Sequence, residues 1–212
     1  YRDTIEEYNN SLDKDEQFDM GADDGTFFMN YHDWRDNFSS LFVNIDFPAK
    51  WTGVRFKSAW TGTACGGLPT SMDREVLTRF AQNPQFLVRP RVDTEMMFSM
   101  TQTGGRLPKA KRTYSEYPFA ETMHYACASV FHLDYNKRHL EAFDRHKMTM
   151  LTPVKREREN SGRCHLKGGE TYVIIPCTEL PNKMGEFYVS IYVDQPLRDV
   201  EIKRVFHPKD SN

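Results

Sequence analysis

Apolar and polar side chains alternate along most of the chain from Trp51 onward. Residues 186–193 alternate strictly, and Met96, Phe98 and Met100 recur at every second position. This period of two is that of a half-buried β-strand. Together with short apolar runs, it predicts strands at Val54–Trp60, Pro84–Arg89, Thr94–Thr101, Met123–Leu133, Lys147–Leu151, Thr171–Cys177, Glu186–Val193 and Asp199–Phe206. Eight short strands separated by turn residues predict a mainly β fold, an antiparallel β-sandwich.

Two of these predicted strands lie close together between Gly168 and Val193. The first, around Tyr172–Ile175, is short and almost wholly apolar, and the second is the alternating run. Between them, Glu179–Gly185 contains a proline, an asparagine and a glycine, which are residues that reverse the chain direction. We therefore predict that the two strands form an antiparallel pair.

The first part of the chain has a different pattern. Residues 1–25 are acidic and polar, and Phe27–Met29 is expected to form a short strand. Asn30 can cap a following helix through its side-chain oxygen, and apolar residues at helical spacing predict that this helix runs from Tyr31 to Val43. Its apolar face, which needs a cover, consists of Tyr31, Trp34, Phe38, Leu41 and Phe42.

Composition and charge exclude several classes of protein. The chain has 212 residues, 39% of them hydrophobic, which is enough to fill a sizeable core. The net charge of −2, with both signs mixed, provides no basic field for nucleic acid. No apolar run approaches the roughly 20 residues that cross a bilayer, so no transmembrane segment is expected. The four cysteines are far apart and form no C-x-x-C, which favours free thiols in a reducing compartment.

Four segments of the sequence carry a resemblance to a known family. They follow one another in the order Asp23–Trp34, Ser58–Gly67, Phe80–Phe86 and Gly169–Val193. The first resembles the D-D/E-G-x-F-W-M-S segment that ends the protease core of calpains. The others resemble the S-x-W-x-x-G-x-x-A-G-G, F-x-x-N-P-Q-Y/F and closing-hairpin segments of the β-sandwich that follows this core.

The resemblance implies a fold and a division into domains. Residues 1–47 would be a short α/β remnant of the papain-like protease core. Residues 48–212 would be an antiparallel eight-stranded β-sandwich, the C2-like domain III of calpains. Because the chain begins at Tyr1 without Met, we interpret it as part of a longer protein. We expect a cytoplasmic, intracellular location, with peripheral membrane association as a further expectation.

By the same resemblance, the chain would be the C-terminal regulatory and docking region of a calpain-like, calcium-dependent cysteine endopeptidase. Its expected partners are the remainder of the protease core, phospholipid and other proteins, with no nucleic acid. The alternative is a non-catalytic calpain-like scaffold or a lipid-surface binding module.

The catalytic Cys, His and Asn of calpains lie upstream of the segments that this chain resembles, so it should be inactive alone. Cys65 follows no Gly-Asp or Gly-Asn pair, as the family's nucleophile does, and is expected to be a small core residue. His32 is expected to be structural or exposed.

Calcium is the cofactor that the resemblance implies for the full-length protein. Asp3 and Asp24 match ligand positions of the family's protease core, but Thr26 stands where the family usually has a glutamate. With fewer carboxylates, binding by this chain should be weak or absent. An EF-hand starting at Asp13 is rejected, because Phe18 occupies the position of the required glycine. A C2-like cluster is not predicted either, since the candidate acids are scattered singly at Asp93, Asp134, Asp144, Asp194 and Asp199.

Overall fold

The computed structural model describes residues 2–19, 21, 27–39, 41, 47–103 and 123–205 of the chain. The chain divides into two units, Tyr1–Asp46 and Phe47–Asn212, which we call the N-terminal unit and the sandwich unit.

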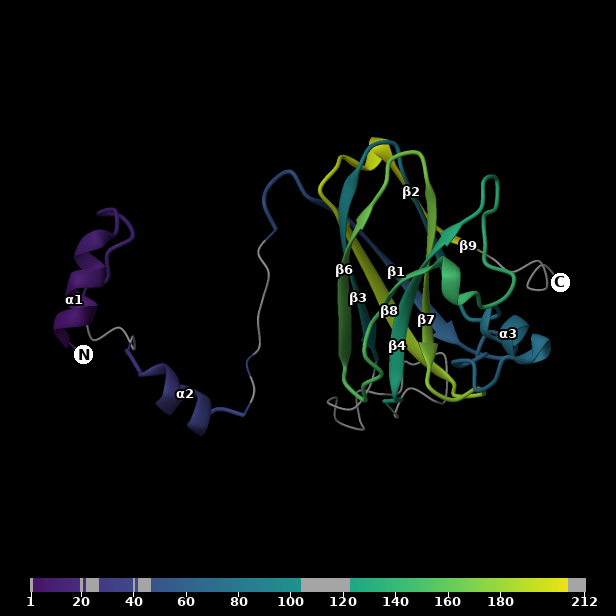
Figure 1. Cartoon of the computed structure of the whole chain (residues 1–212), viewed down its shortest axis with the longest axis horizontal. Helices are drawn as coiled ribbons and strands as arrows, with labels where there is room; N and C mark the ends of the chain where they lie inside the picture. Colours follow the sequence, from purple (N-terminus) through teal and green to yellow (C-terminus); the bar gives the residue numbers. More distant parts are fainter. Residues whose placement is uncertain are drawn as a thin grey trace, which may run out of the picture. The chain divides into compact units, whose positions relative to one another are not determined.

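The described part of the N-terminal unit contains two short helices, α1 (Arg2–Ser11) and α2 (Tyr31–Asn37) (Figure 1). As predicted, Asn30 caps α2, because its side-chain oxygen accepts a hydrogen bond of 2.8 Å from the backbone N–H of His32. The helix ends at Asn37 and not at Val43, which lies outside the described residues. Phe38, the next residue, has an extended backbone with φ −112° and ψ 121°, and its N–H makes the last hydrogen bond of the helix, to the backbone oxygen of Trp34.

The strand predicted at Phe27–Met29 is wrong, because this segment has no regular structure. A strand needs a neighbour with which to form backbone hydrogen bonds, and the described part of the N-terminal unit contains no other strand. The aromatic side chains of α2 do share one face. The rings of Tyr31 and Trp34 stack at a centroid distance of 6.0 Å, and those of Trp34 and Phe38 at 6.2 Å.

The sandwich unit consists of two antiparallel sheets (Figure 1). The four-stranded sheet has the order β1–β8–β3–β6, and the five-stranded sheet has the order β5–β4–β7–β2–β9. The strands are β1 (Thr52–Trp60), β2 (Gln85–Pro90), β3 (Thr94–Gln102), β4 (Ala126–Leu133), β5 (Met148–Leu151), β6 (Glu159–Leu166), β7 (Thr171–Thr178), β8 (Gly185–Val193) and β9 (Val200–Val205). Helix α3 (Arg74–Phe80) and the 3-10 helices η2 (Arg145–Lys147) and η3 (Leu197–Asp199) lie in the connections.

The predicted mainly β sandwich is confirmed, and each of the eight predicted strands is present. The described residues contain a ninth strand, β6, which the sequence pattern did not indicate. Its core-facing positions are Asn160, Gly162, Cys164 and Leu166, so only the last carries a large apolar side chain. The small residue at 162 is required, because a Cβ there would meet the side chains of Met150 and Phe98. The packing of the core therefore requires polar and small residues on β6, at this edge of the four-stranded sheet.

The prediction that Thr171–Cys177 and Glu186–Val193 form an antiparallel pair is wrong. β7 pairs with β2 and β4, whereas β8 lies in the other sheet and pairs with β1 and β3. Both strands are strongly apolar, and each is most completely buried as an inner strand of one of two facing sheets. The connecting residues 179–184 are enough to cross the roughly 10 Å between packed sheets. Turn residues therefore predicted the reversal but not the pairing partner.

Two apolar cores hold the sandwich unit together. The main core lies between the sheets and contains Trp60, whose indole N–H donates a hydrogen bond of 3.0 Å to the backbone oxygen of Pro176 in the facing sheet. The second core covers the other face of the five-stranded sheet. There Phe80 at the end of α3 packs edge-to-face against Phe131 and Phe143. The five-stranded sheet is thus apolar on both faces.

The sandwich unit begins with an aromatic contact on the other sheet. The ring of Phe47 stacks on that of Tyr192 in β8 at a centroid distance of 4.4 Å, and it also contacts Trp51 at 5.2 Å. A Cβ at Gly53 would lie 2.6 Å from the Tyr192 ring, so glycine lets this ring lie flat on β1. The start of the unit is therefore fixed to the outer face of the four-stranded sheet.

Three of the segments that carry the family resemblance meet at one end of the sandwich. The side-chain amide of Asn83 donates to the backbone oxygen of Gly67 at 3.1 Å, and the backbone N–H of Asn182 donates to the backbone oxygen of Cys65 at 2.8 Å. Gly67 has a positive φ of 66°, and a Cβ there would lie 2.4 Å from the backbone nitrogen of Pro181. These residues have a structural role, because they join the connections that follow β1, α3 and β7.

We predict that Gly67→Ala lowers the free energy of unfolding by at least about 3 kcal/mol, because it combines left-handed backbone strain with a clash against backbone atoms. Gly62 is the matched control, since it also has a positive φ but nothing lies within 4 Å of an added Cβ. Gly62→Ala should cost only about 1–2 kcal/mol. Urea unfolding of both variants measures the difference, and equal losses would contradict the steric role of Gly67.

Candidate functional site

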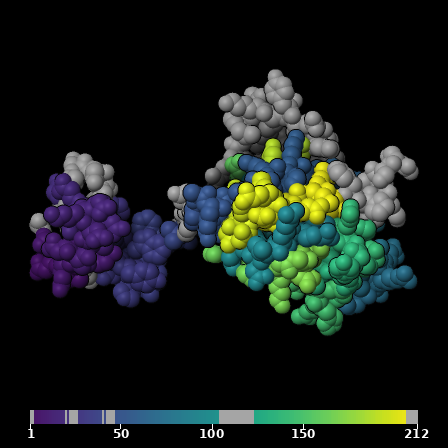
Figure 2. All heavy atoms as spheres, turned by 90° about the horizontal axis from the view of Figure 1, so that it is seen from above, coloured from purple at the N-terminus to yellow at the C-terminus, as the bar shows by residue number. Residues whose placement is uncertain are grey.

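Three connections lie side by side at the opposite end of the sandwich. They are Arg91–Asp93 between β2 and β3, Lys167–Glu170 between β6 and β7, and Asp194–Asp199 between β8 and β9, and we call them the loop end. The backbone N–H of Arg91 donates to the backbone oxygen of Asp199 at 2.9 Å, and that of Gly169 donates to the backbone oxygen of Pro90 at 2.8 Å. Figure 2 looks onto this end and shows the yellow β8–β9 segment beside the teal β2–β3 segment.

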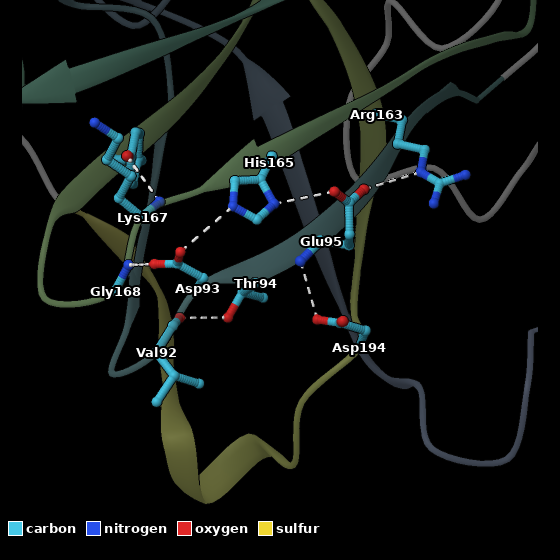
Figure 3. A network of polar contacts seen from close by, with 10 residues as sticks. Val92, Asp93, Thr94, Glu95, Arg163, His165, Lys167, Gly168 and Asp194 are labelled. Carbon is cyan, nitrogen blue, oxygen red and sulfur yellow. Dashed lines mark hydrogen bonds and ion pairs between the residues drawn. The ribbon is translucent and has the colours of Figure 1, made fainter.

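A polar network extends from the loop end onto the outer face of the four-stranded sheet (Figure 3). His165 on β6 lies directly opposite Glu95 on β3, and its Nδ1 is 3.0 Å from the Glu95 carboxylate. Its Nε2 is 3.8 Å from the carboxylate of Asp93. Arg163, two residues before His165, donates from Nε to Glu95 at 3.1 Å. Because side chains alternate along a strand, positions 163 and 165 share the outer face with Glu95.

The network changes the acidity of its central carboxyl group. The hydrogen bond with His165, followed by that from Arg163, lowers the pKa of Glu95. Cys164 lies on the other side of β6, where burial, with a smaller contribution from the Glu95 charge, raises the pKa of its thiol to about 11. The exposed carboxylate therefore stays ionised to lower pH than usual, and the neighbouring thiol is a poor nucleophile.

The aspartates of a C2-like end do not converge within the described residues. The carboxylate of Asp93 accepts a hydrogen bond of 2.9 Å from the backbone N–H of Gly168. The carboxylate of Asp194 accepts one of 2.9 Å from the backbone N–H of Glu95. In the part of the chain that the structure describes, no three His, Cys, Asp or Glu side chains are grouped as metal ligands would be. These carboxylates instead fix the loop backbones.

Of the two residues predicted as calcium ligands, the structure describes one. Asp3 is exposed in the first turn of α1, where its charge favours the helix N-terminus. Asp24, like Thr26, lies outside the described residues, so the calcium hypothesis stays a prediction.

The two residues examined for catalysis lie where the sequence placed them. Cys65 is buried in the main core, and its Sγ lies 2.9 Å from the backbone oxygen of Gly62. Burial raises the pKa of this thiol, against a smaller opposite effect of the Asn182 backbone. His32 is exposed on α2. The prediction that Cys65 is a core residue is confirmed.

Sequence reasoning missed the network of Glu95, Arg163 and His165. The alternation of β3 placed Glu95 on the outer face. Because β6 was not predicted, nothing in the sequence indicated that Arg163 and His165 would lie beside Glu95.

No helix among the described residues has both the length and the apolar character to span a bilayer.

Comparison with known proteins identifies what the chain is similar to. Residues 56–192 match the family described as calpain large subunit, domain III. The chain is 24% identical over 194 residues to the calpain-2 catalytic subunit of Oryctolagus cuniculus, an alignment that covers 82% of this chain and 44% of that protein. It is 25% identical over 220 residues to calpain-5 of Mus musculus, covering 96% of this chain and 32% of that protein. The chain thus spans less than half the length of these relatives.

We predict that Glu95→Gln lowers the melting temperature by about 1–3 °C near pH 6, because it removes an exposed ion pair. A carboxyl group whose pKa is lowered by folding stabilises the protein above its unfolded pKa of about 4.3, and this contribution is lost as pH falls through the lower folded pKa. The difference between wild type and variant should therefore shrink below pH 4. Thermal unfolding from pH 3 to 7 tests this. Glu179→Gln, at an exposed site outside the network, is the control, and a constant difference for Glu95→Gln would contradict the prediction.

Proposed function

The chain belongs to the calpain large-subunit domain III family, and on that premise we propose that it is the regulatory and docking region of a calpain-type cysteine endopeptidase. The observation that carries this proposal is the family match over residues 56–192, together with alignments that continue into the N-terminal unit. The alignment with calpain-5 leaves only 4% of the chain uncovered, which is fewer residues than the N-terminal unit contains.

The surface of the N-terminal unit supports a docking role for it. Large apolar side chains of this unit are exposed to solvent, with Phe27 at 70% and Leu41 at 67%. The aromatic face of α2 has no buried residue. Contiguous exposed apolar surface in a soluble protein is typical of an interface. We propose that the cover is the remainder of a papain-like protease core, which the greater length of the relatives could accommodate.

In this proposal, bond cleavage takes place on that remaining part of the protein. A cysteine protease needs a thiolate and a histidine in hydrogen-bonding reach of each other. In this chain the thiols of Cys65 and Cys164 both have raised pKa values, which disfavours the thiolate. The contribution of the chain is structural. The N-terminal unit completes the protease core, and the sandwich unit provides a rigid support.

We predict that Phe27→Asp in the full-length parent protein lowers both its peptidase activity and the melting temperature of its protease core. A charged group would have to be buried in the proposed interface, which costs several kcal/mol (about 2–5). Tyr135→Asp is the matched control, because Tyr135 is 92% exposed on the sandwich unit and should tolerate the change. Calorimetry and a peptide-cleavage assay measure the two effects. If Phe27→Asp is tolerated as well as Tyr135→Asp, the docking proposal is wrong.

The loop end favours a second candidate function, contact with a phospholipid surface. Val92 and Leu197 project exposed apolar side chains from neighbouring connections, at 51% and 44% exposure. Basic residues flank them at Arg91, Lys167 and Arg198. Apolar tips beside basic side chains can enter the headgroup layer of an anionic bilayer. This contact would orient the parent enzyme on a membrane.

We predict that the chain co-sediments with vesicles that contain phosphatidylserine and that the double change Val92→Asp, Leu197→Asp reduces the bound fraction at least tenfold. Met72→Asp is the control, since Met72 is even more exposed, at 76%, but lies between β1 and α3 at the other end of the sandwich. Vesicles of neutral lipid should bind less. Equal binding of all variants, or no binding of the wild-type chain, would count against the loop end as a lipid contact.

A further inference from the structure

Two cysteines of the five-stranded sheet lie in direct contact as free thiols. Cys127 on β4 and Cys177 on β7 are opposite each other in antiparallel register, and their Sγ atoms are 3.5 Å apart. Both side chains are fully buried in the second core. We propose that this pair is an oxidative modification site, at which a peroxide-class oxidant forms a disulfide that joins β4 to β7.

The backbone geometry suits this bond. Residues directly opposite each other on antiparallel strands have Cα atoms about 4.5–5.5 Å apart, within the range of about 4.4–6.8 Å that disulfides require. The sulfur atoms must approach from 3.5 Å to roughly 2.05 Å. We expect rotation of the two side chains to provide this approach, because the strands are held in register over eight residue pairs.

The other two cysteines of the chain do not offer such a pair. Cys65 hydrogen-bonds to the backbone oxygen of Gly62, and Cys164 lies on β6 in the facing sheet. All four cysteines lie in the described residues, and the contact between two sulfur atoms occurs at Cys127 and Cys177. We therefore expect the disulfide to form between Cys127 and Cys177 and not with Cys65 or Cys164.

The reaction balances with hydrogen peroxide as the oxidant. The thiolate of one cysteine attacks the O–O bond, which breaks to give a sulfenic acid and hydroxide. The sulfur of the second cysteine then attacks the sulfenic sulfur, so that the S–S bond forms and the S–O bond breaks. Two thiols lose two protons and two electrons, and one peroxide molecule becomes two water molecules.

Burial makes the pair slow to react in both directions. The contact with the Cys127 sulfur, followed by burial, raises the pKa of the Cys177 thiol well above its usual value. Since the thiolate is the reactive form, oxidation should proceed mainly when the sheet opens locally. A reducing thiol must reach the same buried position, so the disulfide should persist once formed. The site would lock the domain after oxidative stress instead of following rapid changes in redox conditions.

The test uses the whole 212-residue chain treated with hydrogen peroxide, with and without urea below the unfolding midpoint. After alkylation of remaining thiols, non-reducing digestion and mass spectrometry should identify a Cys127–Cys177 crosslinked peptide, formed at least tenfold faster in urea. The linked chain should melt about 5–10 °C higher, because the crosslink restricts the unfolded state. Dithiothreitol in the same urea concentration should reverse the shift.

Cys127→Ala and Cys177→Ala should each abolish the crosslink and the thermal shift, whereas Cys164→Ala should retain both. Circular dichroism establishes that each variant is folded, and if an alanine variant does not fold, the wild-type peptide map decides alone. A crosslink to Cys65 or Cys164, oxidation of Cys127 to a sulfinic acid without linkage, or a thermal shift that persists in Cys127→Ala would overturn the proposal.

Discussion

Burial of β7 on both of its faces is the constraint on which the rest of the sandwich depends. Each of its eight residues is buried, with Ile174 among the residues of the main core and Val173 and Ile175 among those of the second. A strand that is apolar on both faces needs cover on both sides. The facing sheet provides one cover. Helix α3 and the connection after β4, which contributes Leu140 and Phe143, provide the other.

This constraint divides the surface of the sandwich unit into two kinds. The outer face of the five-stranded sheet is occupied by its own connections, whereas the outer face of the four-stranded sheet carries polar side chains such as Glu95 and His165. Gly67, Asn83 and Asn182, three residues of the segments that carry the family resemblance, lie at the end of the sandwich away from the loop end. These three residues are therefore explained by the way the connections pack together at that end. The chemistry of the loop end was found only in the structure.

The sequence predicted an element correctly where the residues of that element are sufficient to determine it. Strict alternation located β8, and the short side chain of Asn30 located the start of α2. The sequence predicted less where the structure depends on contacts with another segment of the chain. β6 has a polar inner edge because the side-chain amide of Asn160 donates to the backbone oxygens of Ala126 in β4 and of Pro153 in the connection before β6. The pairing of β7 with β2 and β4, and the contact of His165 with Glu95, likewise depend on neighbours that periodicity cannot identify.

The stacking of Phe47 on Tyr192 has a mechanical consequence. Tension applied through the N-terminal unit enters the sandwich at the start of β1, which is the same end as the loop end. β9 runs antiparallel to β2 and finishes beside Gln85, at the far end. A pull on the two chain ends therefore acts along the strands, and the nine residue pairs between β1 and β8 bear it together as shear and do not unzip one by one. Such a load would therefore be shared along the whole length of β1.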